Sequence, residues 1–176
     1  MPNINDFKSR LAGGGARANQ FRVILPPPLG NVTAAVNTEQ FSFMCKAASL
    51  PGQALTEIGV PFRGRTLYIA GEREFETWTT SVFNDTDFAI RREIERWMNG
   101  INAHSQNTGL TAPIAYEADL KVEQLDRDGT TIKEYTFRGA FPQDLSEITL
   151  AYSDNDNIER FTCTWAYQYF ESNTTS

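Results

Sequence analysis

Alternating side chains in two consecutive stretches constrain the fold of this chain more than any other feature. In residues 116–125, apolar side chains alternate with charged ones, so one set points to a core and the other to solvent. The apolar set is Tyr116, Ala118, Leu120 and Val122, and the charged set is Glu117, Asp119, Lys121 and Glu123. A second stretch, residues 130–141, follows across Asp128-Gly129, a favoured hairpin turn. The pair predicts an antiparallel sheet with one wet face.

Other segments of the chain have the composition of strands. They are predicted at residues 21–25, 40–47, 74–84, 146–152 and 158–170, and Pro, Gly or Asn-rich turns separate several of them. Trp78, Thr80 and Val82 share one face of 74–84. In the last strand, one side consists of Phe161, Cys163, Trp165, Tyr167 and Tyr169.

One helix is predicted with a clear apolar period. Asp85 or Thr86 can cap it, and Asn99-Gly100 is expected to end it. Its apolar stripe, at helical spacing, is Ile90, Ile94, Trp97 and Met98.

A projecting hairpin is predicted around the tight centre Pro61-Phe62-Arg63-Gly64, with arms at residues 55–60 and 65–70. Phe62 near the tip is poorly solvated, so either a partner subunit covers it or the hairpin folds back onto its own sheet. The candidate inter-subunit residues of this hairpin are Leu55, Ile58, Phe62, Arg63, Arg65 and Leu67.

These elements predict a mainly β protein: one antiparallel β-sandwich or barrel of about eight strands, with one flanking helix, over residues 21–170. Residues 1–20, with Gly13-Gly14-Gly15, are expected to form a flexible arm, and residues 171–176 a frayed polar tail. Long strands leave open edges, and pairing with identical neighbours is one way to shield them.

Composition narrows the function classes. The chain has 176 residues, with 16 Lys plus Arg against 22 Asp plus Glu and a net charge of −6, which disfavours tight binding to nucleic acid or to an anionic membrane. No apolar run is long enough to span a membrane, and the N-terminus lacks the pattern of a secretory signal. Two cysteines fit a reducing cytosol.

Catalytic and metal-binding patterns are missing from the sequence. His104 is expected in a solvated loop, and Cys45 and Cys163 as buried apolar residues. Residues 154–157 lack the glycine and the distant glutamate of an EF-hand loop, so a turn is expected there. We therefore expect no enzyme activity, no metal and no cofactor.

Four ordered segments resemble the tail tube proteins of contractile-tailed bacteriophages. Residues 41–52, FSFMCKAASLPG, match an F-x-C-K-A-x-x-L-P segment. Residues 70–78, AGEREFETW, match an A-G-[DE]-R-x-F-x-x-W stretch. Gly139-Ala140-Phe141-Pro142 and residues 158–169 match a G-x-[WF]-P segment and a closing strand. The resemblance covers about residues 21–171, and the longer loop at 26–40 departs from it.

The resemblance implies a virion structural protein that self-assembles. Its subunits would form hexameric rings whose sheets join into a continuous lumen-lining barrel, and the rings would stack into a tube inside a contractile sheath. The implied partners are further copies of the chain, the sheath, and baseplate and tail terminator proteins. Double-stranded DNA would pass without specific binding during genome ejection. Assembly would take place in the host bacterial cytoplasm, without membrane insertion by the subunit.

Acidic residues on the wet strand faces are the candidates for the lumen surface: Glu74, Glu76, Glu117, Asp119 and Glu123. The same faces could instead turn outward toward the sheath. Three alternative functions remain open: a tube-initiating or baseplate protein, the inner tube of a phage-derived injection system, and a soluble β-sandwich module that binds carbohydrate through exposed Trp and Tyr.

Overall fold

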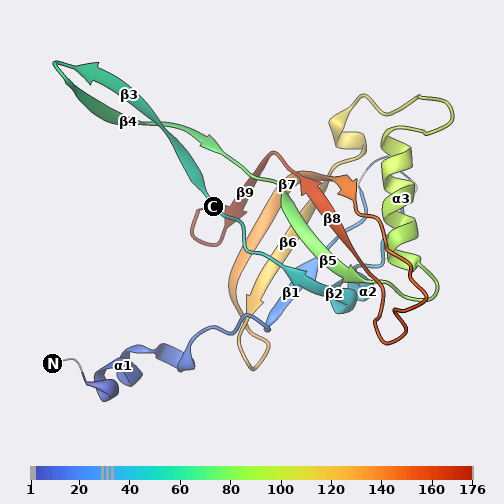
Figure 1. Cartoon of the computed structure of the whole chain (residues 1–176), viewed down its shortest axis with the longest axis horizontal. Coiled ribbons are helices and arrows are strands. Elements are labelled where there is room, and N and C mark those ends of the chain that lie inside the picture. The colour runs from blue at the N-terminus through green and yellow to red at the C-terminus, as the bar shows by residue number, and fades with distance from the viewer. Residues whose placement is uncertain (1–2, 29, 31, 33, 176) are drawn as a thin grey trace.

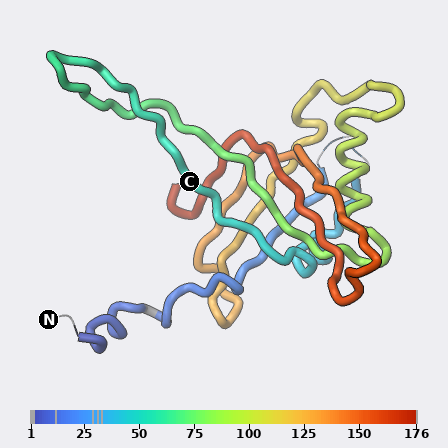
Figure 2. Tube along the Cα trace, in the orientation of Figure 1, coloured from blue at the N-terminus to red at the C-terminus, as the bar shows by residue number. Residues whose placement is uncertain are grey.

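The protein consists of a curved β-sheet body with two projections (Figure 1), as seen in a computed structural model that describes residues 3–28, 30, 32 and 34–175. One projection is the N-terminal arm, with α1 (Ile4–Arg10) and the short 3-10 helix η1 (Ala12–Gly14). The other is a ribbon of two strands, β3 (Ala54–Phe62) and β4 (Arg65–Glu74). Figure 2 shows that both extend away from the side of the body that carries α3 (Ala89–Ile101).

The body is a seven-stranded sheet in which every pairing is antiparallel. The strand order is β1-β6-β7-β8-β5-β2, and β9 pairs with β7. The strands are β1 (Phe21–Ile24), β2 (Cys45–Ala48), β5 (Trp78–Phe83), β6 (Ala118–Leu125), β7 (Thr131–Leu145), β8 (Arg160–Ala166) and β9 (Tyr169–Ser172). The predicted mainly β, antiparallel class is confirmed, and β1 and β2 lie at the two ends of the sheet.

A bulge near the middle of β7 allows this strand to serve both halves of the sheet. Residues 131–140 of β7 pair with β6, and residues 141–145 pair with β8. Gly139 has a φ of +62°, in the left-handed region that favours glycine, and its N–H donates to Asp119 Oδ1 at 3.1 Å. The register between β6 and β7 shifts here, as expected of a β-bulge that bends its strand.

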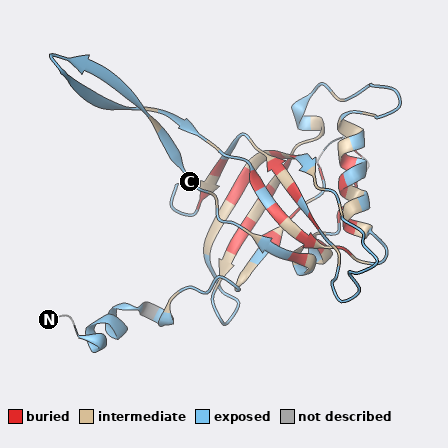
Figure 3. Ribbon diagram, viewed as in Figure 1, coloured by how far each residue is buried: buried red, intermediate tan, exposed pale blue. Residues whose placement is uncertain are grey.

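Alternation of side chains places the core between the sheet halves, as Figure 3 shows by burial. The residues predicted to share a face of β5 are Trp78, Thr80 and Val82, and all are buried. They pair across the strands with Trp165, Cys163 and Phe161 of β8, which are also buried. Thr80 accepts a hydrogen bond from Trp165 Nε1 at 3.0 Å and donates to the Cys163 carbonyl at 3.4 Å, so its hydroxyl is satisfied inside the core.

Helix α3 closes one side of the core with the predicted apolar stripe. Ile90, Ile94 and Trp97 are buried, and Trp97 Nε1 donates to the Tyr116 carbonyl at 2.7 Å. The helix runs to Ile101, slightly beyond the predicted stop at residues 99–100. Its N-cap is Phe88 in a left-handed conformation, while Asp85 Oδ1 accepts from the Ala89 N–H at 3.0 Å.

The prediction of one strand at residues 40–47 is wrong for the first half of this segment. Residues Thr38–Met44 form α2, and only Cys45–Ala48 form a strand, β2. The Asn37 side chain accepts from two N–H groups of the first turn, and a capped start of this kind favours a helix. Phe41 is buried while Phe43 is 81% exposed. In a strand these two residues would share a face, whereas in a helix they point to different sides.

Four further segment predictions differ from the structure. The predicted strand 158–170 is divided, because β8 ends at Ala166 and β9 begins at Tyr169. Residues 146–152 form no strand: they begin the loop between β7 and β8, with its residues from 149 to 158 exposed. The predicted strand 74–84 is divided, because β4 ends at Glu74 and β5 begins at Trp78. The predicted frayed tail begins with Glu171 and Ser172, which belong to β9. A short 3-10 helix, η2 (Pro113–Ala115), precedes β6.

Candidate assembly surfaces

Within the described part of the chain, no second layer covers the β3–β4 ribbon, and every residue from 57 to 70 is exposed (Figure 3). The predicted projecting hairpin is confirmed. Its turn is made by Arg63 and Gly64, both with positive φ, between the paired residues Phe62 and Arg65. Two positive φ angles define the tight turn that matches the strand twist. Phe62 is 66% exposed, so it does not fold back onto the chain's own sheet.

One face of the ribbon is apolar. Residues directly opposite each other on paired strands share a face, and the register pairs Ile58 with Ile69 and Val60 with Leu67. With Phe62, this apolar ribbon face exposes five large side chains, each by 40–66%. A contiguous exposed apolar patch on a folded protein marks an interaction surface. Among the predicted hairpin residues, Ile58, Phe62 and Leu67 lie on this face.

The base of the ribbon is fixed to a defined geometry. Thr56 Oγ1 donates to the Glu72 carbonyl at 3.1 Å, and Arg73 Nη1 donates to Gln53 Oε1 at 2.7 Å. A Cβ at Gly71 would lie 2.5 Å from Thr56 Oγ1, so only glycine allows the strands to approach here. These contacts hold the two strands of the ribbon together where it leaves the body.

The N-terminal arm carries a second exposed apolar surface. Ile4, Phe7 and Leu11 follow helical spacing and are 68%, 65% and 44% exposed. α1 buries none of its residues, and a capping box between Asn3 and Asp6 holds its first turn. The arm predicted as flexible thus contains a short helix whose apolar side faces solvent.

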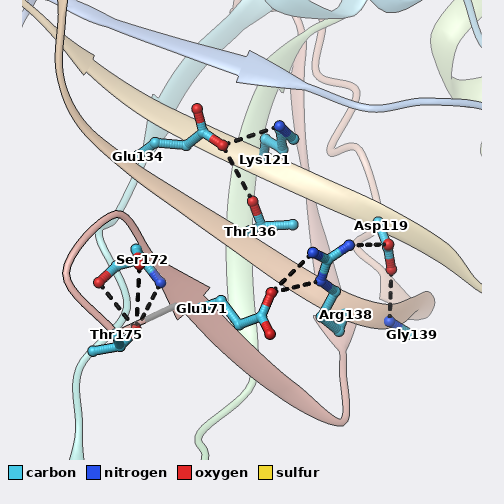
Figure 4. A network of polar contacts seen from close by, with 9 residues as sticks. All are labelled: Asp119, Lys121, Glu134, Thr136, Arg138, Gly139, Glu171, Ser172 and Thr175. Atoms are coloured by element: carbon cyan, nitrogen blue, oxygen red, sulfur yellow. Dashed lines mark hydrogen bonds and ion pairs between the residues drawn. The ribbon is translucent and has the colours of Figure 1, made fainter.

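The outer face of β1, β6, β7 and β9, called here the polar face, is covered by ion pairs (Figure 4). Arg138 bridges Asp119 at 2.6 Å and Glu171 at 2.9 Å, and these hydrogen bonds raise the pKa of its guanidinium further. Two more pairs lie on the same face: Arg22–Glu123 at 2.5 Å and Lys121–Glu134 at 3.0 Å.

Three of the five acidic lumen candidates come together at the polar face. Asp119 and Glu123 lie on it, and Glu117 beside β6 accepts a hydrogen bond from Gln168 at 3.3 Å. The polar face then has five acidic and three basic side chains, so its formal charge is 3 − 5 = −2. Glu74 and Glu76 lie elsewhere, at the end of β4 and between β4 and β5, and both are exposed.

Sequence reasoning missed three charged residues of the polar face. Glu134, Arg138 and Glu171 join the polar face from β7 and β9. Polar side chains occupy both sides of β7 from Thr131 to Thr136, so alternation gives little signal there. The charge pairing depends on which strands are neighbours. The predicted hairpin turn specifies the pairing of β6 with β7, but the pairing of β1 with β6 and of β9 with β7 joins segments that lie farther apart, and alternation does not specify it.

The histidine and the two cysteines, considered as catalytic or metal-binding residues, do not form a common site. His104 is exposed in a loop, and Cys45 and Cys163 are free and buried. Burial raises the pKa of the Cys45 thiol to about 12 and also raises that of Cys163. Over residues 3–28, 30, 32 and 34–175, no three His, Cys, Asp or Glu side chains gather around a possible metal position.

The structure also tests for membrane-spanning helices and for an exposed aromatic surface that could bind carbohydrate. None of the helices in the described part of the chain has the length and apolar character needed to cross a bilayer. The alternative of a carbohydrate module relies on exposed Trp and Tyr. The three tryptophans are buried, whereas Tyr68 and Tyr152 are exposed.

Together, a β-sheet body with open sheet ends and exposed apolar projections defines a class of protein: an assembly subunit. Comparison with known proteins identifies the family. The family described as "Phage tail tube protein" matches residues 16–173. The chain belongs to this family, whose members are structural proteins of phage tails, and the resemblance inferred from its four segments is confirmed.

Relatives by sequence carry the same description. The chain is 32% identical over 148 residues to "Tail tube protein gp19" of Enterobacteria phage T4, covering 82% of this chain and 90% of that protein. It is 30% identical over 169 residues to "Tail tube protein" of Serratia phage KSP90, covering 95% of each. Both relatives are phage proteins.

Solved structures share the fold at low sequence identity. A chain from the structure titled "Cryo-EM structure of the anti-feeding prophage (AFP) baseplate, 6-fold symmetrised" gives a TM-score of 0.65 at 13% identity, covering 89% of this chain and 94% of that one. A chain from an extracellular contractile injection system, described as a sheath/tube terminator in the extended state, gives 0.62 at 14% identity, with coverage of 89% and 95%. These similarities extend the fold to contractile injection systems.

Proposed function

We propose that this chain is the repeating subunit of a contractile phage tail tube. Six copies form a ring, neighbouring sheets join into a barrel that lines the lumen, and rings stack into a conduit for genome ejection. Sheath, baseplate and terminator proteins surround and end this tube in the virion. The subunits assemble in the host cytoplasm and do not insert into a membrane.

The observation that carries this proposal is the unfinished surface of the single copy. The sheet ends at β1 and β2, and the ribbon exposes five large apolar side chains that no part of the described chain covers. Open sheet edges offer free backbone groups to a partner, and exposed apolar patches of this size mark interaction surfaces. Identical neighbours supply both an edge and a complementary surface without any second protein.

The proposed conduit acts mechanically, so its interior must let DNA pass without binding it. Phosphate contacts from Lys and Arg would add up along the path and hold the duplex. The polar face offers three basic side chains, and each is already paired with a carboxylate. We place this face toward the lumen because its slight negative charge and satisfied cations suit a passing polyanion.

Imaging of the purified chain by electron microscopy tests the proposal. Stacked rings with six subunits and an open central channel are expected. Isolated rings that never stack would favour a tube-initiating protein. A monodisperse monomer at concentrations up to about 1 mM would contradict self-assembly, since an interface of standard size binds more tightly than that.

A further inference from the structure

The exposed end of the ribbon is positively charged. Residues 58–69 contain Arg63 and Arg65 and no acidic residue, so their net charge is +2. The Arg63 guanidinium lies 5.4 Å from the centre of the Phe62 ring. The ribbon tip, residues 62–65, therefore presents an aromatic ring and two cations together on a turn with a defined conformation.

The loop between β7 and β8 has the opposite character. Residues 146–159 contain Glu147, Asp154, Asp156 and Glu159 and no Lys or Arg, so their net charge is −4. The loop also exposes large apolar side chains: Leu150 by 77%, Tyr152 fully and Ile158 by 70%. An open depression of about 910 Å³ lies among its residues. Pockets of about 300–1,000 Å³ hold drug-sized molecules, so an aromatic side chain has room here.

The two ends of this acidic loop are tied to the body. Arg91 Nη1 donates to the Ser146 carbonyl at 3.0 Å, and Ser146 Oγ accepts from the Thr162 N–H at 2.9 Å. At the other end, Asn84 Nδ2 donates to Glu159 Oε2 at 2.9 Å. Between these ends, Asn157 donates to Asp154. The loop is thus presented by the body and is not a free tail.

We propose that the ribbon tip of one copy docks onto the acidic loop of a second copy. This inference rests on the proposed self-assembly and names the two surfaces that meet. The tip and the loop lie at opposite ends of the molecule (Figure 1), so one copy cannot satisfy its own pair. A contact between different surfaces of identical subunits is head-to-tail, and such contacts build rings or continuous stacks.

Other described segments fit the ribbon tip less well. The β6–β7 turn, residues 126–130, has a net charge of −1 and no apolar residue. The loop at residues 102–112 has no Asp or Glu. Helix α1 with Asp6, Lys8 and Arg10 has a net charge of +1 and would repel the two arginines. The acidic loop combines negative charge with exposed apolar side chains.

Reciprocal charge reversal tests the contact. The ribbon variant is Arg63→Glu/Arg65→Glu, and the loop variant is Asp154→Arg/Asp156→Arg. Each variant alone is expected to raise the concentration needed for polymerisation by about tenfold or more. The ribbon variant changes residues 58–69 from +2 to 2 − 4 = −2, which the acidic loop repels, and the loop variant changes the loop from −4 to −4 + 4 = 0, which removes the attraction. An equal mixture of the two is expected to polymerise at a lower concentration than either variant alone. The two glutamates introduced at the tip then face the two arginines introduced in the loop, and the unaltered tip of the loop variant meets the unaltered loop of the ribbon variant.

The control variant is Asp126→Arg/Asp128→Arg, which makes the same charge change on the β6–β7 turn. Light scattering and negative-stain images measure polymer, and circular dichroism confirms that each variant is folded. The control is expected to polymerise normally. Polymerisation of either variant alone at the concentration that suffices for the unaltered chain, or a mixture that polymerises no better than its two components, would overturn the tip-to-loop contact, while tubes of the unaltered chain still support the proposed function. An unaltered chain that stays monomeric would overturn the proposed function itself.

Discussion

Thr80 shows how a single hydroxyl group specifies the core. It is fully buried, accepts from Trp165 Nε1 and donates to a carbonyl of the neighbouring strand. Thr80→Val keeps the shape but leaves the indole N–H without a partner, so the free energy of unfolding should fall by about 1–3 kcal/mol. Urea denaturation measures this change. Thr79→Val, on the exposed face of the same strand, should change it by no more than about 0.5 kcal/mol, and equal effects of the two would contradict this account.

Gly139 tests the bulge that bends β7. Gly139→Ala forces a side chain into a left-handed conformation and brings its Cβ within 2.9 Å of Gln168 Cγ. Backbone strain of this kind costs about 1–3 kcal/mol of stability. Gly129→Ala shares the positive φ but meets no atom within 4 Å, so its cost should be smaller. A greater loss of unfolding free energy for Gly129→Ala would show that crowding at the bulge is unimportant.

Among the elements, the N-terminal arm gives the clearest separation of folding from assembly. Since α1 buries none of its residues, deleting residues 1–15 should leave the circular dichroism of the body unchanged. The same deletion should shorten or abolish polymers, because the exposed stripe of Ile4, Phe7 and Leu11 is then lost. Polymer length in negative-stain images measures the effect.

Two point variants serve as a matched pair for the arm. Ile4→Ser/Phe7→Ser changes the apolar stripe and should weaken polymerisation, whereas Asn5→Ser/Lys8→Ser changes the rest of the helix and should not. Tubes of normal length from the truncated chain would contradict a role of the arm in assembly.

Strand elements could be predicted from the sequence where one face is wet and the other buried. The alternation in residues 116–125 and around Trp78 predicts both the strands and their inward faces, and the Pro61–Gly64 centre predicts the ribbon. The method fails at residues 40–47, where a side chain of Asn37 caps a helix that apolar content alone hides. It also fails at residues 146–152, where Leu150 and Tyr152 are exposed in a loop and pair with no strand.

Only part of the two candidate surfaces, the ribbon and the polar face, could be predicted from the sequence. Ribbon residues such as Phe62 and Arg63 follow from the turn. The apolar ribbon face needs the register between β3 and β4, and the polar face needs the neighbours of β7. Register within one hairpin supplies the apolar ribbon face, and pairing of β7 with β9, which is distant in the sequence, supplies the polar face; local composition determines neither.

At the scale of the whole molecule, the charge of the lumen can be tested without a phage. Glu117→Lys raises the formal charge of a six-membered ring by 6 × 2 = 12 while leaving the four ion pairs of the polar face intact. Tubes of this variant should retain short double-stranded DNA in sedimentation at about 50 mM salt and release it at about 200 mM, because phosphate binding weakens steeply with salt.

The control for the lumen charge is Glu39→Lys, which makes the same charge change in the exposed first turn of α2. Its tubes should release DNA at both salt concentrations. Equal retention by Glu39→Lys and Glu117→Lys would show that the polar face does not line the channel.

The most direct test of self-assembly through unpaired sheet ends is a cryo-electron microscopy map of the polymer formed by the unaltered chain. We expect rings of six copies in which the margins beside β1 and β2 meet neighbouring copies, with the ribbon of each copy covered by another. A map of single copies, with the ribbon exposed and both margins unpaired, would contradict the account.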